Sequence, residues 1–414
     1  MEQCDCVIAG GGPAGIVLAL LLARGGVRVS VLEKHGDFLR DFRGDTVHAS
    51  TVRLMDELGL GPAFRRLPQT RLGAFEMPTA TGRITLGDFA GLEPPYNYVA
   101  MLPQWDFLNF LVAAARQEPT FSIRMNTEVT DLVEQDGRVS GVTYRSKEGE
   151  TGEVIAPLVV ACDGRDSVLR SAADLTLRQY EVPFDVWWFR LPRADGEGGA
   201  LASIFPTFKG KDMLLAINRE GYYQMAYFVP KGHDGRMRAE GIDSFRQRIA
   251  AVRPDLADRV DTLQSMDDVF TLDVKLNHLD RWHRPGLLLI GDAAHAMSPA
   301  GGVGINLAIQ DAVAAARLLR DPLRSGSVSE ADLHRVQRRR AMPTRVIQAM
   351  QRMLHDVVFR ATFEGRRSGP PPFVLWMLQH LPGLDSLPAR LIAFGPRPEH
   401  APNFARRPPA ETAS

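Results

Sequence analysis

The sequence is poor in cysteine and lacks long apolar runs. Its three cysteines, Cys4, Cys6 and Cys162, are too few for a disulfide framework, and the lone Cys-x-Cys lacks the second pair that a zinc site needs. The longest apolar run, residues 16–23, is far shorter than the ~20 residues of a membrane-spanning helix. We therefore expect buried thiols, no metal site and no stable membrane association.

The chain also lacks a net charge, because 49 lysines and arginines balance 49 aspartates and glutamates. This balance gives no reason to expect a nucleic acid as a partner. The N-terminus shows no basic segment followed by an apolar run and a cleavage site, so we expect a cytoplasmic protein. The G-x-S-x-G and H-E-x-x-H motifs are absent, which argues against a serine hydrolase and a zinc protease.

What the sequence does contain is VIAGGGPAGIVLALLLARGGVRVSVLEK at residues 7–34. Apolar runs, a glycine cluster and a helix-like run predict a strand, a helix and a second strand. The glycines of G-x-G-x-x-G have separate tasks: Gly10 permits a tight turn, Gly12 lets a pyrophosphate approach the backbone, and Gly15 lets the helix pack on the strand. The pattern therefore predicts a dinucleotide-binding fold.

The groups around these glycines suit a dinucleotide. Pro13 and Ala14 begin the helix, whose free N–H groups and partial positive charge favour phosphate. Glu33 ends the second strand, where a carboxylate can accept hydrogen bonds from ribose hydroxyls. This loop alone does not separate NAD from FAD.

Two later motifs resolve that choice. VVACDGRDSVLR places Asp163 and Gly164 directly after an apolar run, and GLLLIGDAAHAMSPAGGVGINLAIQDA places Asp292 after another. Together with the glycine loop, these stretches resemble the ordered motifs of the flavoprotein monooxygenase family typified by para-hydroxybenzoate hydroxylase. The resemblance covers about residues 4–320, and it implies FAD as the cofactor.

The resemblance implies an α/β fold: a Rossmann-like FAD-binding domain with an inserted, mostly antiparallel substrate domain and a helical C-terminal part. Strand-like aromatic segments with Gly and Pro breaks across 180–275, and a helix near 241–253, agree with such an insertion. We expect an FAD-binding domain at 1–70, 101–178 and 276–320, a substrate domain at 71–100 and 179–275, C-terminal helices at 321–395 and a flexible tail at 396–414.

The resemblance also implies roles for further residues. Gly302, Gly304, Ile305 and Asn306 would begin a helix facing the pyrimidine edge of the flavin, Pro299 would lie along the ring, and Asp292 would bind the ribityl chain. Arg43 would lie near the flavin, and Gln104, Val129 and Lys34 would contact other parts of FAD. Asp163 would also lie near the path of the nicotinamide cofactor.

The reaction that the resemblance implies is hydroxylation through a flavin C4a-hydroperoxide, with NAD(P)H as a transient reductant and O2 as co-substrate. No catalytic side chain is assigned, because the flavin carries the chemistry. We expect an aromatic or polyketide-like natural product as the substrate, and a monomer or homodimer. Four aromatic-strand residues are predicted to line an apolar substrate cleft: Trp187, Phe189, Tyr223 and Met225.

Other readings stay open. The enzyme could use FAD for reduction, dehydrogenation or a non-redox cyclisation in a biosynthetic pathway. A flavin halogenase is suggested by WWFRLP at 187–192, but the chain has no lysine between Lys34 and Lys147 to hold the halogenating species. A quinone-pathway hydroxylase touching a membrane would use the apolar segment 370–395, which Pro382 and Pro388 interrupt. A non-enzymatic flavin sensor lacks an evident output domain.

Overall fold

The computed structural model describes residues 2–39, 46–79, 82–89, 91–194, 197, 206–219, 221–380 and 386–408. Its central element is a six-stranded sheet of order β21-β22-β13-β2-β3-β9. The strands from β22 to β9 are parallel, and β21 is antiparallel to β22. These strands are β2 (Cys6–Ala9), β3 (Val29–Leu32), β9 (Phe121–Arg124), β13 (Val159–Ala161), β21 (His283–Arg284) and β22 (Leu287–Leu289).

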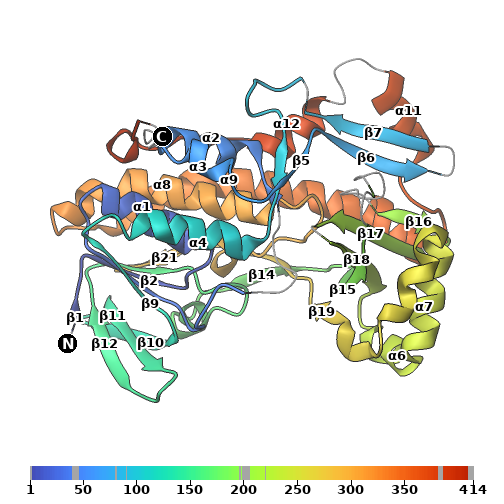
Figure 1. Cartoon of the computed structure of the whole chain (residues 1–414). Helices are drawn as coiled ribbons and strands as arrows, with labels where there is room; N and C mark the ends of the chain where they lie inside the picture. The colour runs from blue at the N-terminus through green and yellow to red at the C-terminus, as the bar shows by residue number, and fades with distance from the viewer. Residues whose placement is uncertain are drawn as a thin grey trace.

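The parallel strands are short apolar runs because both faces of the sheet are covered. Helices α1 (Pro13–Arg24), α4 (Gln104–Ala115) and α8 (Gly304–Arg324) cover one face, as Figure 1 shows. The other face carries a four-stranded sheet made of β1 (Glu2–Gln3), β10 (Thr127–Gln135), β11 (Arg138–Ser146) and β12 (Thr151–Ile155). Segments far apart in sequence therefore form one α/β unit, which confirms the predicted fold class.

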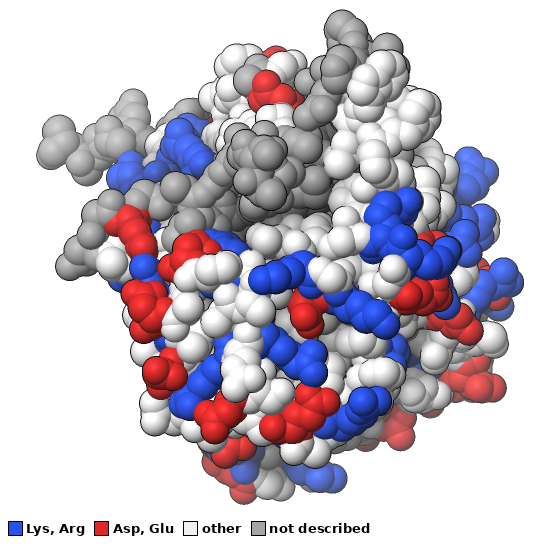
Figure 2. Space-filling model, turned by 90° about the vertical axis from the view of Figure 1, so that its right-hand side faces the viewer, with Lys and Arg blue, Asp and Glu red and all other residues white. Residues whose placement is uncertain are grey.

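A second, five-stranded antiparallel sheet has the order β16-β17-β18-β15-β19. Its strands are β15 (Phe184–Pro192), β16 (Thr207–Lys209), β17 (Asp212–Asn218), β18 (Tyr222–Pro230) and β19 (Phe270–Leu272). Helices α6 (Asp234–Ala239) and α7 (Gly241–Val252) cover one face of this inserted sheet (Figure 1). On the side of the molecule seen in Figure 2, basic and acidic side chains are interspersed, so neither sign of charge dominates that face.

Smaller elements connect these layers. The short strands are β4 (Thr46–Val47), β5 (Thr70–Leu72), β6 (Ala74–Thr79), β7 (Gly82–Asp88), β8 (Val99–Met101), β14 (Leu177–Tyr180) and β20 (Leu276–Leu279). The short helices are α2 (Ala49–Glu57), α3 (Gly61–Phe64) and α5 (Val168–Ala172), with 3-10 turns at Pro254–Thr262, Met266–Asp268, Gly291–Ala293 and Asn403–Ala405. Among the described helices, none has the length and apolar character needed to cross a bilayer.

Helix α9 (Glu330–Leu354) lies beside α8 and reaches the inserted sheet (Figure 1). Ser329 and Asp332 form the capping box at its start. Pro343 should end or kink a helix from its sequence alone, but α9 continues past it. Burial of flanking residues such as Val336 and Ile347 offsets the one missing hydrogen bond. A π-helical turn (His355–Arg360), α10 (Ala361–Phe363), α11 (Pro372–His380) and α12 (Ser386–Phe394) follow.

The end of the chain corrects one prediction. The Pro- and Arg-rich composition suggested a flexible tail from residue 396, but residues 396–408 pack against the body of the protein. Glu399 is 3 % exposed, and its carboxylate pairs with the guanidinium groups of Arg339 at 2.6 Å and Arg340 at 3.5 Å. A carboxylate with partners on α9 therefore anchors a segment whose own composition looked unstructured.

Three buried histidines make stability depend on pH. Burial lowers the pKa values of His48, His283 and His355 to about 4, from the ordinary 6.5 of the unfolded chain. Their contribution to stability is complete above pH 6.5 and is lost as the pH falls toward 4. We expect the free energy of unfolding, measured with denaturant, to decline over this range. His283→Phe should make the decline shallower by up to about 3 kcal/mol, and an unchanged decline would contradict this account.

Candidate cofactor and substrate site

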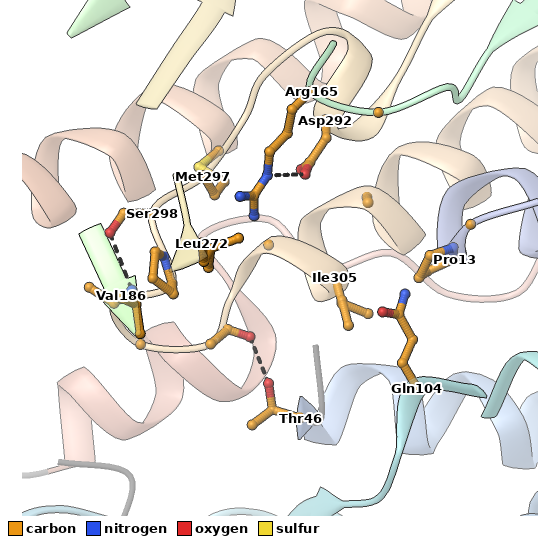
Figure 3. Close-up of a pocket in the computed structure, with 18 of the residues that line it drawn as sticks. Pro13, Thr46, Gln104, Arg165, Val186, Leu272, Asp292, Met297, Ser298 and Ile305 are labelled. Atoms are coloured by element: carbon orange, nitrogen blue, oxygen red, sulfur yellow. Dashed lines mark hydrogen bonds and ion pairs between the residues drawn. The ribbon is translucent and has the colours of Figure 1, made fainter. Parts of the chain in front are cut away.

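One cavity of about 960 Å³ extends from the glycine loop to the inserted sheet. Figure 3 shows part of its lining, with Pro13, Gln104 and Asp292 on one side and Val186 and Leu272 on the other. We call the part lined by the glycine loop and the two later motifs the polar end. The apolar end is lined by the inserted sheet and by helices α9, α11 and α12, among others by Val186, Trp188, Leu215, Ile217, Phe228 and Leu272.

The glycine loop lies at the polar end, in tight contact with the sheet. Gly10 has φ +100°, and a Cβ there would lie 2.4 Å from the carbonyl oxygen of Cys162. A Cβ on Gly15 would lie 2.0 Å from the carbonyl oxygen of Gly10, so the start of α1 also requires glycine. A Cβ on Gly12 would meet nothing within 4 Å. The loop therefore leaves open space beside Gly12, where a pyrophosphate would fit.

Two helix N-termini reach the same cavity. Helix α1 begins after Gly12 and α8 begins after Val303, and neither N-cap residue forms a side-chain hydrogen bond in the described structure. Neither helix has an acidic residue in its first turn. Pro13 and Ala14 of α1, and Gly304 and Ile305 of α8, line the cavity. Both helix dipoles therefore favour negative charge at the polar end, at two separate points.

Glu33 closes one side of the glycine loop. Its carboxylate accepts hydrogen bonds from the backbone N–H groups of Gly11 at 2.7 Å and His35 at 3.1 Å. Glu33 is 7 % exposed and lines the cavity. The contacts fix its side chain at the end of β3, where it can also accept hydrogen bonds from sugar hydroxyls.

Asp163 offers an acceptor to a bound molecule. Its Oδ2 accepts a hydrogen bond from the backbone N–H of Leu169 at 3.2 Å. Its Oδ1 is buried and has no hydrogen-bond partner among the described residues. Burial raises the pKa of Asp163, against the opposing effect of its hydrogen bonds to Ser167 and Leu169. A buried acceptor in a cavity wall fits a cofactor that donates a hydrogen bond, such as a hydroxyl group of FAD.

Asp292 of the third motif and Arg165 of the second form an ion pair in the wall of the cavity. Arg165 Nε donates to Asp292 Oδ2 at 3.1 Å, and both side chains line the polar end (Figure 3). Arg165 was missed by sequence reasoning, although it directly follows Asp163-Gly164 in the second motif. A cation between two cofactor-binding motifs suits a cofactor that carries phosphates.

His48 was also missed. Its Nε2 and the Thr46 hydroxyl each donate a hydrogen bond of 2.9 Å to the carbonyl oxygen of Gly302. The two donors hold the loop that leads into α8. A histidine before a helix carries no motif that could have revealed this role.

The other residues predicted to bind the cofactor lie in the wall of this one cavity, with three exceptions. The lining of the cavity includes Gly10, Gly12, Pro13, Ala14, Glu33, Lys34, Gln104, Val129, Asp163, Gly164, Asp292, Pro299, Gly302, Gly304 and Ile305. The amide of Gln104 lies between Pro13 and Ile305 in Figure 3, hence between the two helix N-termini. The exceptions are Gly15, which packs beneath the loop, Arg43, which lies outside the described residues, and Asn306.

The side chain of Asn306 is turned away from the cavity. Its Oδ1 accepts hydrogen bonds from the hydroxyls of Ser50 at 2.6 Å and Thr51 at 2.9 Å, both on α2. Each helical residue is rotated by about 100° from the previous one, so Ile305 can face the cavity while Asn306 faces α2. The side chain of Asn306 therefore binds α2, and the predicted contact of this residue with the flavin edge stays a prediction.

The prediction for the four aromatic-strand residues is corrected. Trp187, Phe189, Tyr223 and Met225 are fully buried and form one cluster with Phe245 of α7. They occupy the face of the inserted sheet that α7 covers, whereas Val186 and Trp188 occupy the opposite face and line the cavity. The predicted substrate lining was one residue out of register.

Trp187 and Trp188 make a matched pair for mutation. Trp187 Nε1 donates to Asp234 Oδ1 at 2.7 Å. We therefore expect Trp187→Phe to lower the free energy of unfolding by about 1–3 kcal/mol and to leave the KM of the substrate unchanged. Trp188→Phe should leave stability nearly unchanged but raise the KM of a substrate held in the apolar end. Denaturant unfolding and steady-state kinetics of both variants test this, and a KM effect confined to Trp187→Phe would contradict it.

Ionisable side chains are unevenly distributed over the cavity. Within the described lining, Glu33, Lys34, Asp163, Arg165 and Asp292 belong to the polar end, whereas His48 lies at the boundary, beside Gly302 and beside Ile392 of α12. The apolar end is lined by aliphatic, aromatic and methionine side chains alone. A charged group on a ligand would lie there without a partner, which is costly in a desolvated site.

Comparisons with known proteins agree with this geometry. A family model described as FAD binding domain matches residues 3–350. The 6-methylpretetramide 4-monooxygenase of Streptomyces rimosus is 37% identical over 344 residues, which cover 82% of this chain and 81% of that protein. The structure of the anhydrotetracycline hydroxylase OxyS from Streptomyces rimosus matches with a TM-score of 0.75 and 24% identity, over 95% of this chain and 76% of that one. The Diels-Alderase PyrE3 of pyrroindomycin biosynthesis matches with a TM-score of 0.76 and 20% identity, over 95% and 80%.

Proposed function

Because the chain belongs to the FAD binding domain family and is an FAD-dependent monooxygenase, we propose that it hydroxylates a neutral, polycyclic aromatic compound of the polyketide type. The observation that carries the proposal is the lining of the apolar end, where the described residues include no ionisable side chain. A benzoate or an amino acid would bury its charge there without a partner. A neutral planar ring system would instead gain about 25 cal/mol per Å² of buried apolar surface.

The polar end suits FAD, which supplies the activation of O2 once NAD(P)H has reduced it. We assign the diphosphate to the N-terminus of α1 beside Gly12, and the ribose hydroxyls to Glu33. Asp292 and Asp163 would accept hydrogen bonds from the central part of the cofactor. The N-terminus of α8 would stabilise the negative charge of the reduced ring. The apolar walls keep water away from the reacting atoms.

The halogenase alternative loses further support. Lys34 is the one lysine in the described cavity lining, and it follows Glu33, at the ribose side of the proposed cofactor site. A lysine beside the substrate, as halogenation requires, is not present in that lining.

Turnover of neutral polycyclic phenols tests the proposal. FAD-loaded protein would be incubated with NADPH, isotopically labelled O2 and either hydroxyanthracene or a hydroxyanthracene carboxylate, which keeps the phenol and adds only the charge. We expect incorporation of one labelled oxygen atom into the phenol and none into the carboxylate. Equal turnover of the carboxylate would refute the substrate class. Product formation without consumption of NADPH or O2 would instead favour the non-redox alternative.

A further inference from the structure

One buried face of α9 and of the π-turn holds the loop between the two ends of the cavity. The Nε2 of Gln351 donates to the carbonyl oxygens of Ser298 at 2.8 Å and Ala300 at 2.9 Å, and its Oε1 accepts from the N–H of Ser298 at 3.2 Å. His355 Nε2 lies 2.9 Å from the hydroxyl oxygen of Ser298. Two side chains, one helical turn apart, therefore bind Ser298 and Ala300, the residues on either side of Pro299.

Burial makes these contacts persistent. Gln351 is 0 % exposed and His355 is 1 % exposed. Burial lowers the pKa of His355 to about 4, so its ring is neutral at physiological pH. The Nδ1 has no hydrogen-bond partner in the described structure, and a buried N–H without an acceptor is rare. We therefore place the hydrogen on Nε2, which donates to the Ser298 hydroxyl.

The same part of the chain forms a wall of the apolar end. Met350 and Leu354 of α9, and Val358 of the π-turn, line the cavity. A π-helical turn changes the register of a helix and is frequent at functional sites. Residues that would contact the substrate thus alternate with residues that hold the loop.

The loop leads directly to the proposed flavin site. Ser298, Pro299 and Ala300 line the cavity, and the chain then passes through Gly302 into the N-terminus of α8. Figure 3 shows Ser298 near Val186, at the boundary of the apolar end. Fixing this loop fixes the position of the α8 dipole relative to anything bound in the cavity.

We propose that Gln351 and His355 are positioning residues, which hold the segment 298–304 against the flavin so that the start of α8 stabilises the reduced, anionic ring. The proposal rests on the FAD-dependent function proposed above. Neither side chain lines the cavity; both act through the loop. Loosening the loop should weaken the interaction of the helix dipole with the reduced form, and so make reduction less favourable.

The test measures the flavin rather than turnover. Gln351→Met nearly keeps the volume of the side chain and removes its hydrogen bonds, and His355→Phe removes the hydrogen bond with a flat but larger ring. Each variant, loaded with FAD, would be titrated with dithionite beside an indicator dye. We expect a tenfold or larger loss in the ratio of reduced to oxidised flavin, equivalent to a midpoint potential about 30 mV more negative, with FAD content unchanged. His355→Gln can still donate to Ser298, so its midpoint potential should lie close to that of the wild-type protein.

Gln348→Met provides the matched control. Gln348 lies on the same buried face of α9, and its Nε2 donates to the carbonyl oxygens of Asn277 at 2.7 Å and Ala296 at 3.5 Å, both outside the segment 298–304. We expect a similar loss of stability but a wild-type potential. Wild-type potentials in Gln351→Met and His355→Phe, or the same shift in Gln348→Met, would overturn the positioning role alone. Wild-type protein that cannot be loaded with FAD would overturn the proposed function as well.

Discussion

Replacement of Gly10 by alanine is expected to yield protein that retains almost no FAD and unfolds more easily. The new Cβ would lie 2.4 Å from the carbonyl oxygen of Cys162, in a backbone conformation with φ +100°. The positive φ costs an alanine about 1–3 kcal/mol and the overpacking costs about 1–3 kcal/mol, and both penalties fall on the folded state. The ratio of flavin to protein after purification, and denaturant unfolding of the flavin-free protein, measure the two effects.

Gly137→Ala is the control for this prediction. Gly137 also has a positive φ, +73°, in the Asp136-Gly137 turn between β10 and β11, but a Cβ there would meet nothing within 4 Å. The Gly137→Ala variant should lose about 1 kcal/mol in free energy of unfolding and retain its FAD. Full flavin content in Gly10→Ala would contradict the role assigned to the glycine loop.

Replacement of Arg340 by methionine is expected to destabilise the protein by about 3–5 kcal/mol. Arg340 is 0 % exposed, and its Nε donates to Asp311 Oδ1 at 3.0 Å. Asp311 also accepts from His295 at 2.5 Å and from the backbone N–H of Gly291 at 3.2 Å. Methionine would leave the buried carboxylates of Asp311 and Glu399 with fewer partners. Denaturant unfolding at neutral pH measures the loss.

Arg338→Met is the control, because Arg338 lies two residues earlier on α9 and is exposed. It should change the free energy of unfolding by less than about 0.5 kcal/mol.

The buried network also makes stability depend on pH. Burial raises the pKa of Asp311, but the charges and hydrogen bonds of His295 and Arg340 outweigh it, so the pKa is lowered below 3.8. The stability from this group is therefore present above pH 3.8 and lost below it. Equal effects of the two arginine substitutions would show that the buried network does not stabilise the fold.

The polar end of the cavity was largely predictable from the sequence. Gly10 and Gly15 are demanded by close backbone approach, Gly12 leaves open space beside the loop, and Asp163 and Asp292 follow apolar strands at one edge of a parallel sheet. Such requirements are local, so they leave a readable pattern. The exception within this set, Asn306, depended on the rotation of α8 and not on spacing.

The apolar end was not predictable at the level of residues. Along β15 the cavity face and the α7 face are both apolar, so alternation carries no polar signal to distinguish Trp187 from Trp188. Which face a strand residue occupies is then decided by packing alone. The sequence could predict an apolar cleft but not its lining.

Distant contributions were missed for a related reason. Gln351 and His355 reach the loop from a helix that begins far along the chain, and Glu399 pairs with Arg339 and Arg340 from a segment that resembles a tail. Single glutamines, histidines and glutamates carry no motif. Their roles emerge when tertiary packing places them beside a partner.

The most direct test of the account is a visible difference spectrum of the FAD-loaded protein titrated with hydroxyanthracene and, separately, with a hydroxyanthracene carboxylate. The account places FAD and a neutral polycyclic ligand in one cavity, with no described ionisable side chain at the apolar end. It predicts that hydroxyanthracene perturbs the flavin absorption in a saturable way and that the carboxylate does not. Protein that fails to take up FAD, or a carboxylate that binds as tightly as the phenol, would contradict it.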